Sequence, residues 1–148
     1  MTPSRSCEIY IDGASRGNPG PAGVGVAFVD GNRRPVHEFA KYLGETTNNV
    51  AEYLALIYAL QEALKIGYTT LVIHTDSELL ARQMSGHYRV RDAHLKLLHD
   101  LAQSLREGFR ACEIRHVPRE QNRLADRLAG HAADRRRHTP AASLITEP

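Results

Sequence analysis

The segment Thr46-Thr47-Asn48-Asn49-Val50-Ala51-Glu52-Tyr53 opens a long apolar helix and places one carboxylate, that of Glu52, in its first turn. Apolar residues recur at helical spacing from Val50 to Ile66, and Gly67 is well placed to end the helix. Asn49 and Glu52 have the spacing of a capping box, which would make the glutamate a structural residue. The alternative is that Glu52 joins other acidic residues near the helix start.

Two further carboxylates, Asp12 and Asp76, close short apolar runs that are typical of buried strands. Each has an ordinary structural explanation, because Asp12-Gly13 could form a turn and Asp76-Ser77 could cap a short helix. Neighbouring strand ends and a helix start can nevertheless bring three carboxylates together. Clustered carboxylates repel one another unless a divalent cation or a proton lies between them. The pattern therefore predicts a metal-dependent enzyme.

The remaining pattern predicts one α/β domain with a mixed sheet packed by helices. The Gly- and Pro-rich stretch Gly13–Gly23 is expected to be a loop, and Asp30-Gly31-Asn32 a hairpin turn that helps make the first three strands antiparallel. Strands are expected at residues 7–12, 24–29, 36–43, 71–73 and 111–117, and helices at 50–66, 77–84, 95–105 and 121–133.

Composition indicates an ordinary globular chain of 148 residues, with 42% hydrophobic and 24% charged residues. The formal charge of +2 does not by itself predict binding to nucleic acid. However, 16 of the 19 basic residues are Arg, whose forked side chain suits phosphates. Two cysteines, Cys7 and Cys112, make no disulfide framework. Without a signal peptide or membrane span, we expect a cytoplasmic monomer. We expect a domain at 1–134 and a disordered, Arg-rich tail at 135–148.

A fourth carboxylate, Asp126, lies early in the last expected helix, where it could instead pair with Arg123 or Arg127. Two divalent ions about 4 Å apart can activate water and stabilise the leaving oxygen of a phosphodiester. Mg²⁺ prefers oxygen ligands, and the chain has no Cys and His set spaced for structural zinc. Phosphodiester hydrolysis fits this inventory of residues best.

Four motifs, in order along the chain, are similar to those of the type 1 ribonuclease H family. They are Tyr-Ile-Asp-Gly at 10–13 followed by Gly-Asn-Pro-Gly at 17–20, Thr-Asn-Asn-Val-Ala-Glu-Tyr at 47–53, Thr-Asp-Ser at 75–77, and Asn-Arg-Leu-Ala-Asp-Arg-Leu-Ala at 122–129. The resemblance covers about residues 8–133 and is strongest to the compact prokaryotic form that lacks a basic protrusion.

The resemblance implies a ribonuclease-H-like fold, in which a mixed sheet of three antiparallel and then two parallel strands is flanked by helices. It implies an endoribonuclease that cuts the RNA strand of RNA–DNA hybrids, leaves a 5′-phosphate, and uses two Mg²⁺ or Mn²⁺ ions. The expected catalytic and metal-binding residues are Asp12, Glu52, Asp76 and Asp126. The expected substrate-binding residues are Asn18, Asn48 and Asn49 for the 2′-hydroxyl groups and Thr47 for a phosphate of the DNA strand.

The chain departs from the family pattern at several positions. It has no Trp and no protrusion, so Tyr88 and Arg89, in a short connection between helices, are the expected substitutes for substrate binding. The family's loop histidine is missing from 118–121, and Glu45 stands where an arginine often supports phosphate binding. The candidates to replace that histidine are His116, His131 and His138.

Two alternatives stay open at this point. A related nuclease that cuts double-stranded RNA, or that works as an exonuclease, would share the same carboxylates. A non-catalytic module that binds hybrids would be expected to lack one acidic ligand, and all four are present.

Overall fold

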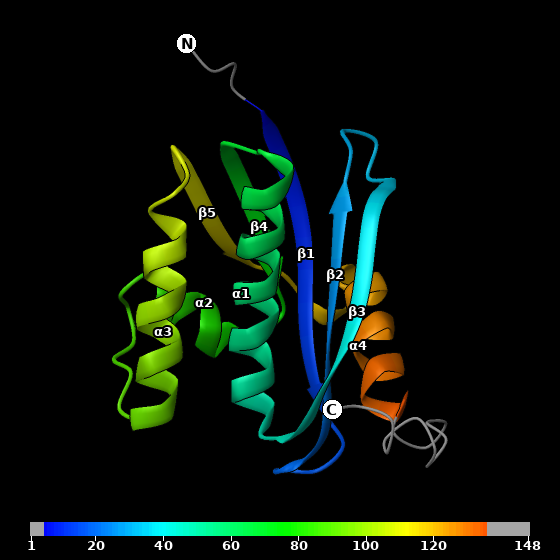
Figure 1. Ribbon diagram of the computed structural model, residues 1–148, viewed down its shortest axis with the longest axis vertical. Coiled ribbons are helices and arrows are strands. Elements are labelled where there is room, and N and C mark those ends of the chain that lie inside the picture. The colour runs from blue at the N-terminus through cyan, green and yellow to red at the C-terminus, as the bar shows by residue number, and fades with distance from the viewer. Residues whose placement is uncertain (1–4, 136–148) are drawn as a thin grey trace, which may run out of the picture.

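The computed structural model describes residues 5–135, which form a five-stranded mixed sheet with helices on both faces (Figure 1). The strands, in the spatial order β3-β2-β1-β4-β5, are β1 Ser6–Ser15, β2 Gly20–Val29, β3 Pro35–Thr46, β4 Thr70–Thr75 and β5 Ala111–His116. The helices are α1 Asn48–Ile66, α2 Glu78–Met84, α3 Ala93–Arg106 and α4 Arg123–Asp134, with a short 3₁₀ turn, η1, at Arg119–Gln121. The first three strands are antiparallel, and β4 and β5 run parallel to β1. The predicted fold class is confirmed.

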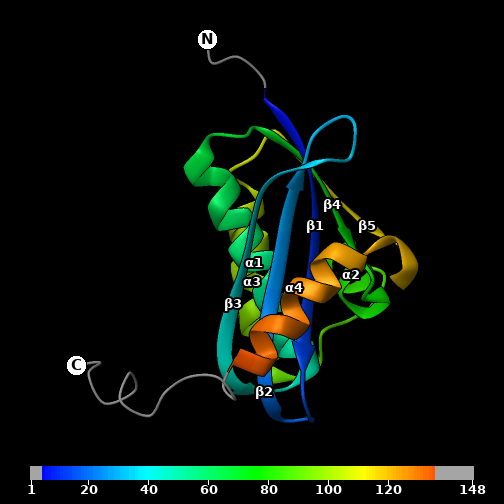
Figure 2. The ribbon, with the colours of Figure 1, turned by 90° about the vertical axis from the view of Figure 1, so that its right-hand side faces the viewer.

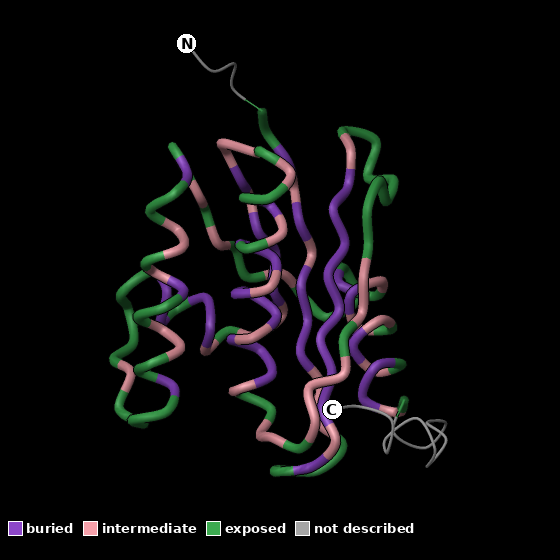
Figure 3. Tube along the Cα trace, viewed as in Figure 1, coloured by how far each residue is buried: buried purple, intermediate pink, exposed green. Residues whose placement is uncertain are grey.

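The helices are divided unequally between the two faces of the sheet. Helices α1 and α3 cover one face, and α4 packs on the opposite face against β1, β2 and β3 (Figure 2). The buried core lies between α1 and the central strands, which are the most continuously buried parts of the chain (Figure 3). Its largest fully buried side chains include Tyr53, Phe28, Ile9, Ile11, Leu56 and Leu60. This core fixes α1 relative to β1, where the acidic residues lie.

Helix α1 ends as its sequence indicates, but it begins two residues earlier than expected, at Asn48, so Glu52 lies beyond its first turn. Its N-terminal cap also differs from the expected one. The side chain of Thr47 accepts a hydrogen bond from the N–H of Val50, so Thr47 is the N-cap. Gly67 adopts a positive φ of 100° and its N–H bonds the carbonyl of Ala63. Glu52 therefore takes no part in a capping box.

The expected loop Gly13–Gly23 is wrong over most of its length, because β1 continues to Ser15 and β2 starts at Gly20. The glycines serve close packing rather than chain flexibility. A Cβ atom on Gly13 would lie 2.3 Å from the backbone of Ala51 in α1, and one on Gly25 would lie 2.3 Å from the carbonyl oxygen of Ala125 in α4. Both helices can therefore approach the sheet backbone directly.

Both cysteines are free, as expected, with Cys7 buried and Cys112 partly buried. The expected tail lies outside the described residues apart from Arg135, so the division at 134 stays a prediction. Within residues 5–135, no helix is both long and apolar enough to cross a lipid bilayer.

Candidate active site

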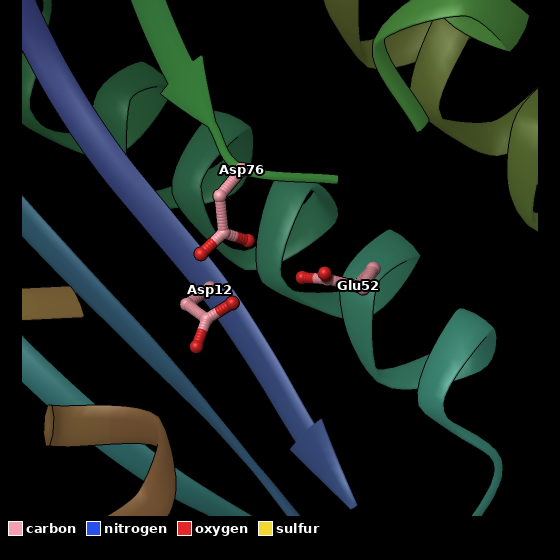
Figure 4. A group of neighbouring side chains, drawn as sticks. All are labelled: Asp12, Glu52 and Asp76. Carbon is pink, nitrogen blue, oxygen red and sulfur yellow. The ribbon is translucent and has the colours of Figure 1, made fainter. Parts of the chain in front are cut away.

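Three carboxylates meet at the centre of the molecule, as the sequence predicts. Asp12 comes from β1, Glu52 from the first turns of α1, and Asp76 from the residue that follows β4, and the three side chains point toward one another (Figure 4). One oxygen atom from each carboxylate can be chosen so that all three lie within 4.8 Å of one another. Parallel pairing of β1 with β4, which places Ile11 beside Thr75, brings the two aspartates to adjacent positions.

The ordinary structural explanations do not account for these three carboxylates, although the pair Asp76-Ser77 does cap α2 through its serine. Asp12 lies inside β1 rather than in a turn or at the strand end, because the strand continues for three more residues. The cap of α2 is Ser77, whose hydroxyl accepts the N–H of Leu80. Glu52 reaches across to the sheet, and its Oε1 accepts the N–H of Gly13 at 2.7 Å. That bond fixes one oxygen of Glu52 beside Asp12.

Electrostatics in this cluster oppose ionisation of the free carboxyl groups. Burial is the largest cause that raises the pKa of Asp12, to about 10, and the charges of Glu52 and Asp76 raise it further. Burial likewise raises the pKa of Glu52 to about 8, against the opposing effect of the hydrogen bond from Gly13. Buried carboxylates held together in this way favour uptake of a proton or a cation.

Asp126 completes the acidic group from the opposite face of the sheet. It lies in the first turn of α4, lines the same cleft, and adds to the causes that raise the pKa of Asp12. The side-chain amide of Asn122, almost fully buried, donates to the carbonyl of Ile11 at 2.9 Å and so holds the start of α4 beside Asp12. The basic partner of Asp126 is Arg119, at 3.4 Å, rather than Arg123 or Arg127, which were the alternative to a role in metal binding.

The four acidic residues lie in a cleft of about 740 Å³ whose lining also includes cationic side chains. The charged residues of this cleft that were not predicted from the sequence are Arg16, Arg119, Arg127 and Asp134. Two of them, Arg127 and Asp134, could have been predicted from their spacing on α4. Positions 126, 130 and 134 are four residues apart, as are 127 and 131, so these residues lie on one face of the helix. A polyanion could therefore meet both carboxylates and cations in one cleft.

Residues 10–132 match the family described as reverse transcriptase-like. Ribonuclease HI of Halobacterium salinarum is 44% identical over 125 residues, which are 84% of this chain and 63% of that protein. LC11-RNase H1, solved in complex with an RNA/DNA hybrid, is 41% identical, with a TM-score of 0.83 over 88% of this chain and 98% of that one. The chain belongs to the type 1 ribonuclease H family. A bifunctional protein of Mycobacterium tuberculosis is also 43% identical, over 90% of this chain but only 37% of its own length.

The residues that the ribonuclease H resemblance assigns to substrate binding fall into two groups. Around the start of α1, Thr47 is the cap, Asn48 and Asn49 are the first helical residues, and the side chain of Asn18 accepts the N–H of Asn48 at 3.0 Å. Of these four, Asn48 lines the cleft. The structure thus brings Asn18 to the helix start, and the group reaches the cleft through Asn48.

Tyr88 and Arg89 lie apart from this group, in the connection between α2 and α3, and neither lines the cleft. The ring of Tyr88 is half-exposed beneath the guanidinium of Arg82, and the backbone carbonyl of Arg89 accepts a bond from the buried Gln83. Their expected role in this ribonuclease H domain stays a prediction.

Of the candidates to replace the missing ribonuclease H histidine, the two within residues 5–135 lie at different distances from the cleft. His116 is the exposed last residue of β5, within the strand as expected. His131 is exposed on α4 and lines the cleft, which makes it the better placed of the two. His138 lies outside the described residues.

Proposed function

We propose that this chain is a metal-dependent endoribonuclease that hydrolyses the RNA strand of RNA–DNA hybrids and leaves a 5′-phosphate. The observation that carries the proposal is the convergence of Asp12, Glu52 and Asp76 in a cleft of a ribonuclease H domain. The relative solved with an RNA/DNA hybrid, which shares 41% of its residues and nearly its whole length, supports the choice of substrate.

The donor set suits hard divalent cations. All the clustered ligands are carboxylates, and within residues 5–135 no Lys, Arg or His side chain forms an ion pair with Asp12 or Glu52. Oxygen donors of this kind fit Mg²⁺ and Mn²⁺. Asp12 and Asp76 would be central to two ions, with Glu52 serving one and Asp126 the other. Bound ions would supply activation of water and stabilisation of charge on the phosphodiester.

The protein's own groups would position the RNA strand over this cluster. We propose that Asn18, Asn48 and Asn49 recognise ribose 2′-hydroxyl groups and that Thr47 holds a phosphate of the DNA strand, as the resemblance implies. Glu52 is fixed on one side by the N–H of Gly13, so its second oxygen is available to a cation or to the RNA. Arg119 and Arg127, which line the cleft, add positive charge for the phosphates.

The first test uses an internally cleavable, end-labelled RNA–DNA hybrid beside double-stranded RNA, double-stranded DNA and single-stranded RNA of the same sequence. Each substrate is incubated with Mg²⁺, Mn²⁺ or EDTA, and with both ends blocked or free. Internal cuts confined to the RNA of the hybrid and lost in EDTA would support the proposal. Cleavage only from free ends, or equal cleavage of double-stranded RNA, would replace it with the related nucleases. Tight binding without cleavage in either metal would leave only a hybrid-binding module.

A further inference from the structure

An ion pair joins the loop after β1 to the last residue of α4, and both partners line the acidic cleft. The short loop between β1 and β2 begins at Arg16, whose Nε lies 2.9 Å from Oδ1 of Asp134 and whose Nη2 lies 3.1 Å from Oδ2. We propose that Arg16 and Asp134 form a clamp that positions Asn18 for recognition of the RNA ribose, and that this clamp contributes to discrimination between RNA and DNA. The inference rests on the proposed function, because it concerns the substrate side of the same site.

The clamp is geometrically specific at its α4 end. Two parallel bonds between a guanidinium and a carboxylate define an orientation as well as a distance. A third bond runs from Nη2 of Arg16 to the carbonyl of Gly130, at 3.2 Å. A Cβ atom on Gly130 would lie 2.8 Å from that same nitrogen, so the glycine leaves the space that the guanidinium occupies. Arg16 therefore fits the last turns of α4 closely.

The same loop is also bonded to β2, to the end of β3 and to the start of α1. The hydroxyl of Ser15 donates to the carbonyl of Thr46 at 2.9 Å, and the N–H of Arg16 donates to the carbonyl of Pro21 at 2.7 Å. The side chain of Asn18 accepts the N–H of Asn48 at 3.0 Å. The loop thus lies between the start of α1 and the end of α4, and the clamp fixes its position relative to α4.

The ion pair is suited to positioning and contributes little to folding. The side chains of Arg16 and Asp134 are 44% and 37% exposed, and exposed pairs add little to global stability. The carboxylate of Asp134 also neutralises the guanidinium, so Arg16 is poorly placed to act as a phosphate ligand itself. Removing either partner should leave the fold intact and release the loop from α4 alone, because the bonds to Thr46, Pro21 and Asn48 remain.

The experiment compares Arg16→Ala, Asp134→Ala and the double variant with wild-type protein. Substrates are an all-RNA hybrid and hybrids with a single 2′-deoxynucleotide placed at successive positions around the cut. We expect each single variant to raise KM about three- to fivefold, the upper range for an exposed pair, with kcat and the melting temperature nearly unchanged. The double variant should be no worse than either single one. The loss of activity caused by the 2′-deoxynucleotide should shrink in all three variants, as it should in Asn18→Ala.

A second exposed ion pair provides the matched control. Arg115 and Glu113 on β5 lie 2.8 Å apart and line none of the cleft, so their alanine variants should leave KM and the 2′-deoxy effect unchanged. An effect of Arg16→Ala without one from Asp134→Ala, together with a weaker salt dependence, would overturn the clamp in favour of a direct phosphate contact. Unchanged KM in both single variants would also overturn it. Failure of wild-type protein to cleave the hybrid would instead refute the proposed function, so the two failures are distinguishable.

Discussion

Replacing Asp12 by Asn should stabilise the metal-free protein while abolishing cleavage. Asp12 is 4% exposed and lies beside Glu52, Asp76 and Asp126, and burial together with these groups raises its pKa from 3.8 to about 10. At neutral pH the metal-free folded state must either hold an extra proton or carry an unfavourable charge. An asparagine has nearly the same shape and avoids both, but it cannot supply an anionic ligand.

The pH dependence of this effect has a definite sign. Because the folded-state pKa of Asp12 lies above the unfolded one, the folded state binds more protons between the two values, and its stability falls as pH rises from about 4 toward 10. Each pKa unit corresponds to about 1.4 kcal/mol, so the ceiling at pH 7 is about 4 kcal/mol. Glu52 shares the repulsion and the site can relax, so we expect about 2 kcal/mol. The gain in unfolding free energy caused by Asp12→Asn should therefore be near zero at about pH 4 and increase as the pH rises.

Urea denaturation in EDTA, at about pH 5 and about pH 8, measures this directly. The control is Glu38→Gln, which replaces an exposed carboxylate on β3, outside the cleft, and should leave the unfolding free energy close to that of wild type at both pH values. Adding Mg²⁺ should then raise the unfolding free energy of wild-type protein more than that of Asp12→Asn. Equal stability of Asp12→Asn and wild type at the higher pH, or an advantage that does not change with pH, would refute the reasoning.

Three other substitutions test separate parts of the site. Gly13→Ala should cost about 2 to 3 kcal/mol and lose cleavage, because its Cβ would meet the backbone of Ala51, whereas Gly31→Ala, with nothing within 4 Å, should melt like wild type. In Glu52→Gln the side chain can still accept the N–H of Gly13, so the variant should still bind the hybrid, as measured by fluorescence anisotropy. Its cleavage rate should fall about a hundredfold or more, and near-normal turnover would contradict a metal-binding role. Arg89→Ala should raise KM and lower the slope of affinity against salt by about one if Arg89 contacts a phosphate, and an unchanged slope would remove it from the substrate-binding residues.

The convergence of the carboxylates could be predicted because it depends on local patterns and on strand pairing. The apolar runs before Asp12 and Asp76 place both aspartates at neighbouring positions on paired strands. The helix that carries Glu52 starts close to those positions. Sequence spacing alone could not decide between capping and catalysis. Thr47 and Ser77 take the capping roles, which leaves the acidic residues to the site.

The main errors come from the docking of helices on the two faces of the sheet. Gly13 and Gly23 fall in a stretch that is typical of a loop in sequence, yet a side chain at Gly13 would collide with the backbone of α1, and one at Gly23 with the backbone of α4. The pairing of Arg16 with Asp134 spans 118 positions and depends on where α4 ends. No local signal carries that information, because the angle and depth of the helix are set by packing across three strands.

The position of α4 at the end of the described chain matters for how the protein is made. During synthesis the three clustered carboxylates are present once β4 has emerged, but Asp126 and the clamp partner Asp134 come last. A chain interrupted before α4 would expose to solvent the face of β1, β2 and β3 that α4 otherwise covers. Docking of α4 therefore both brings Asp126 to the other three carboxylates and covers that face, so we expect a chain that ends before α4 to aggregate and to lack the complete acidic cleft.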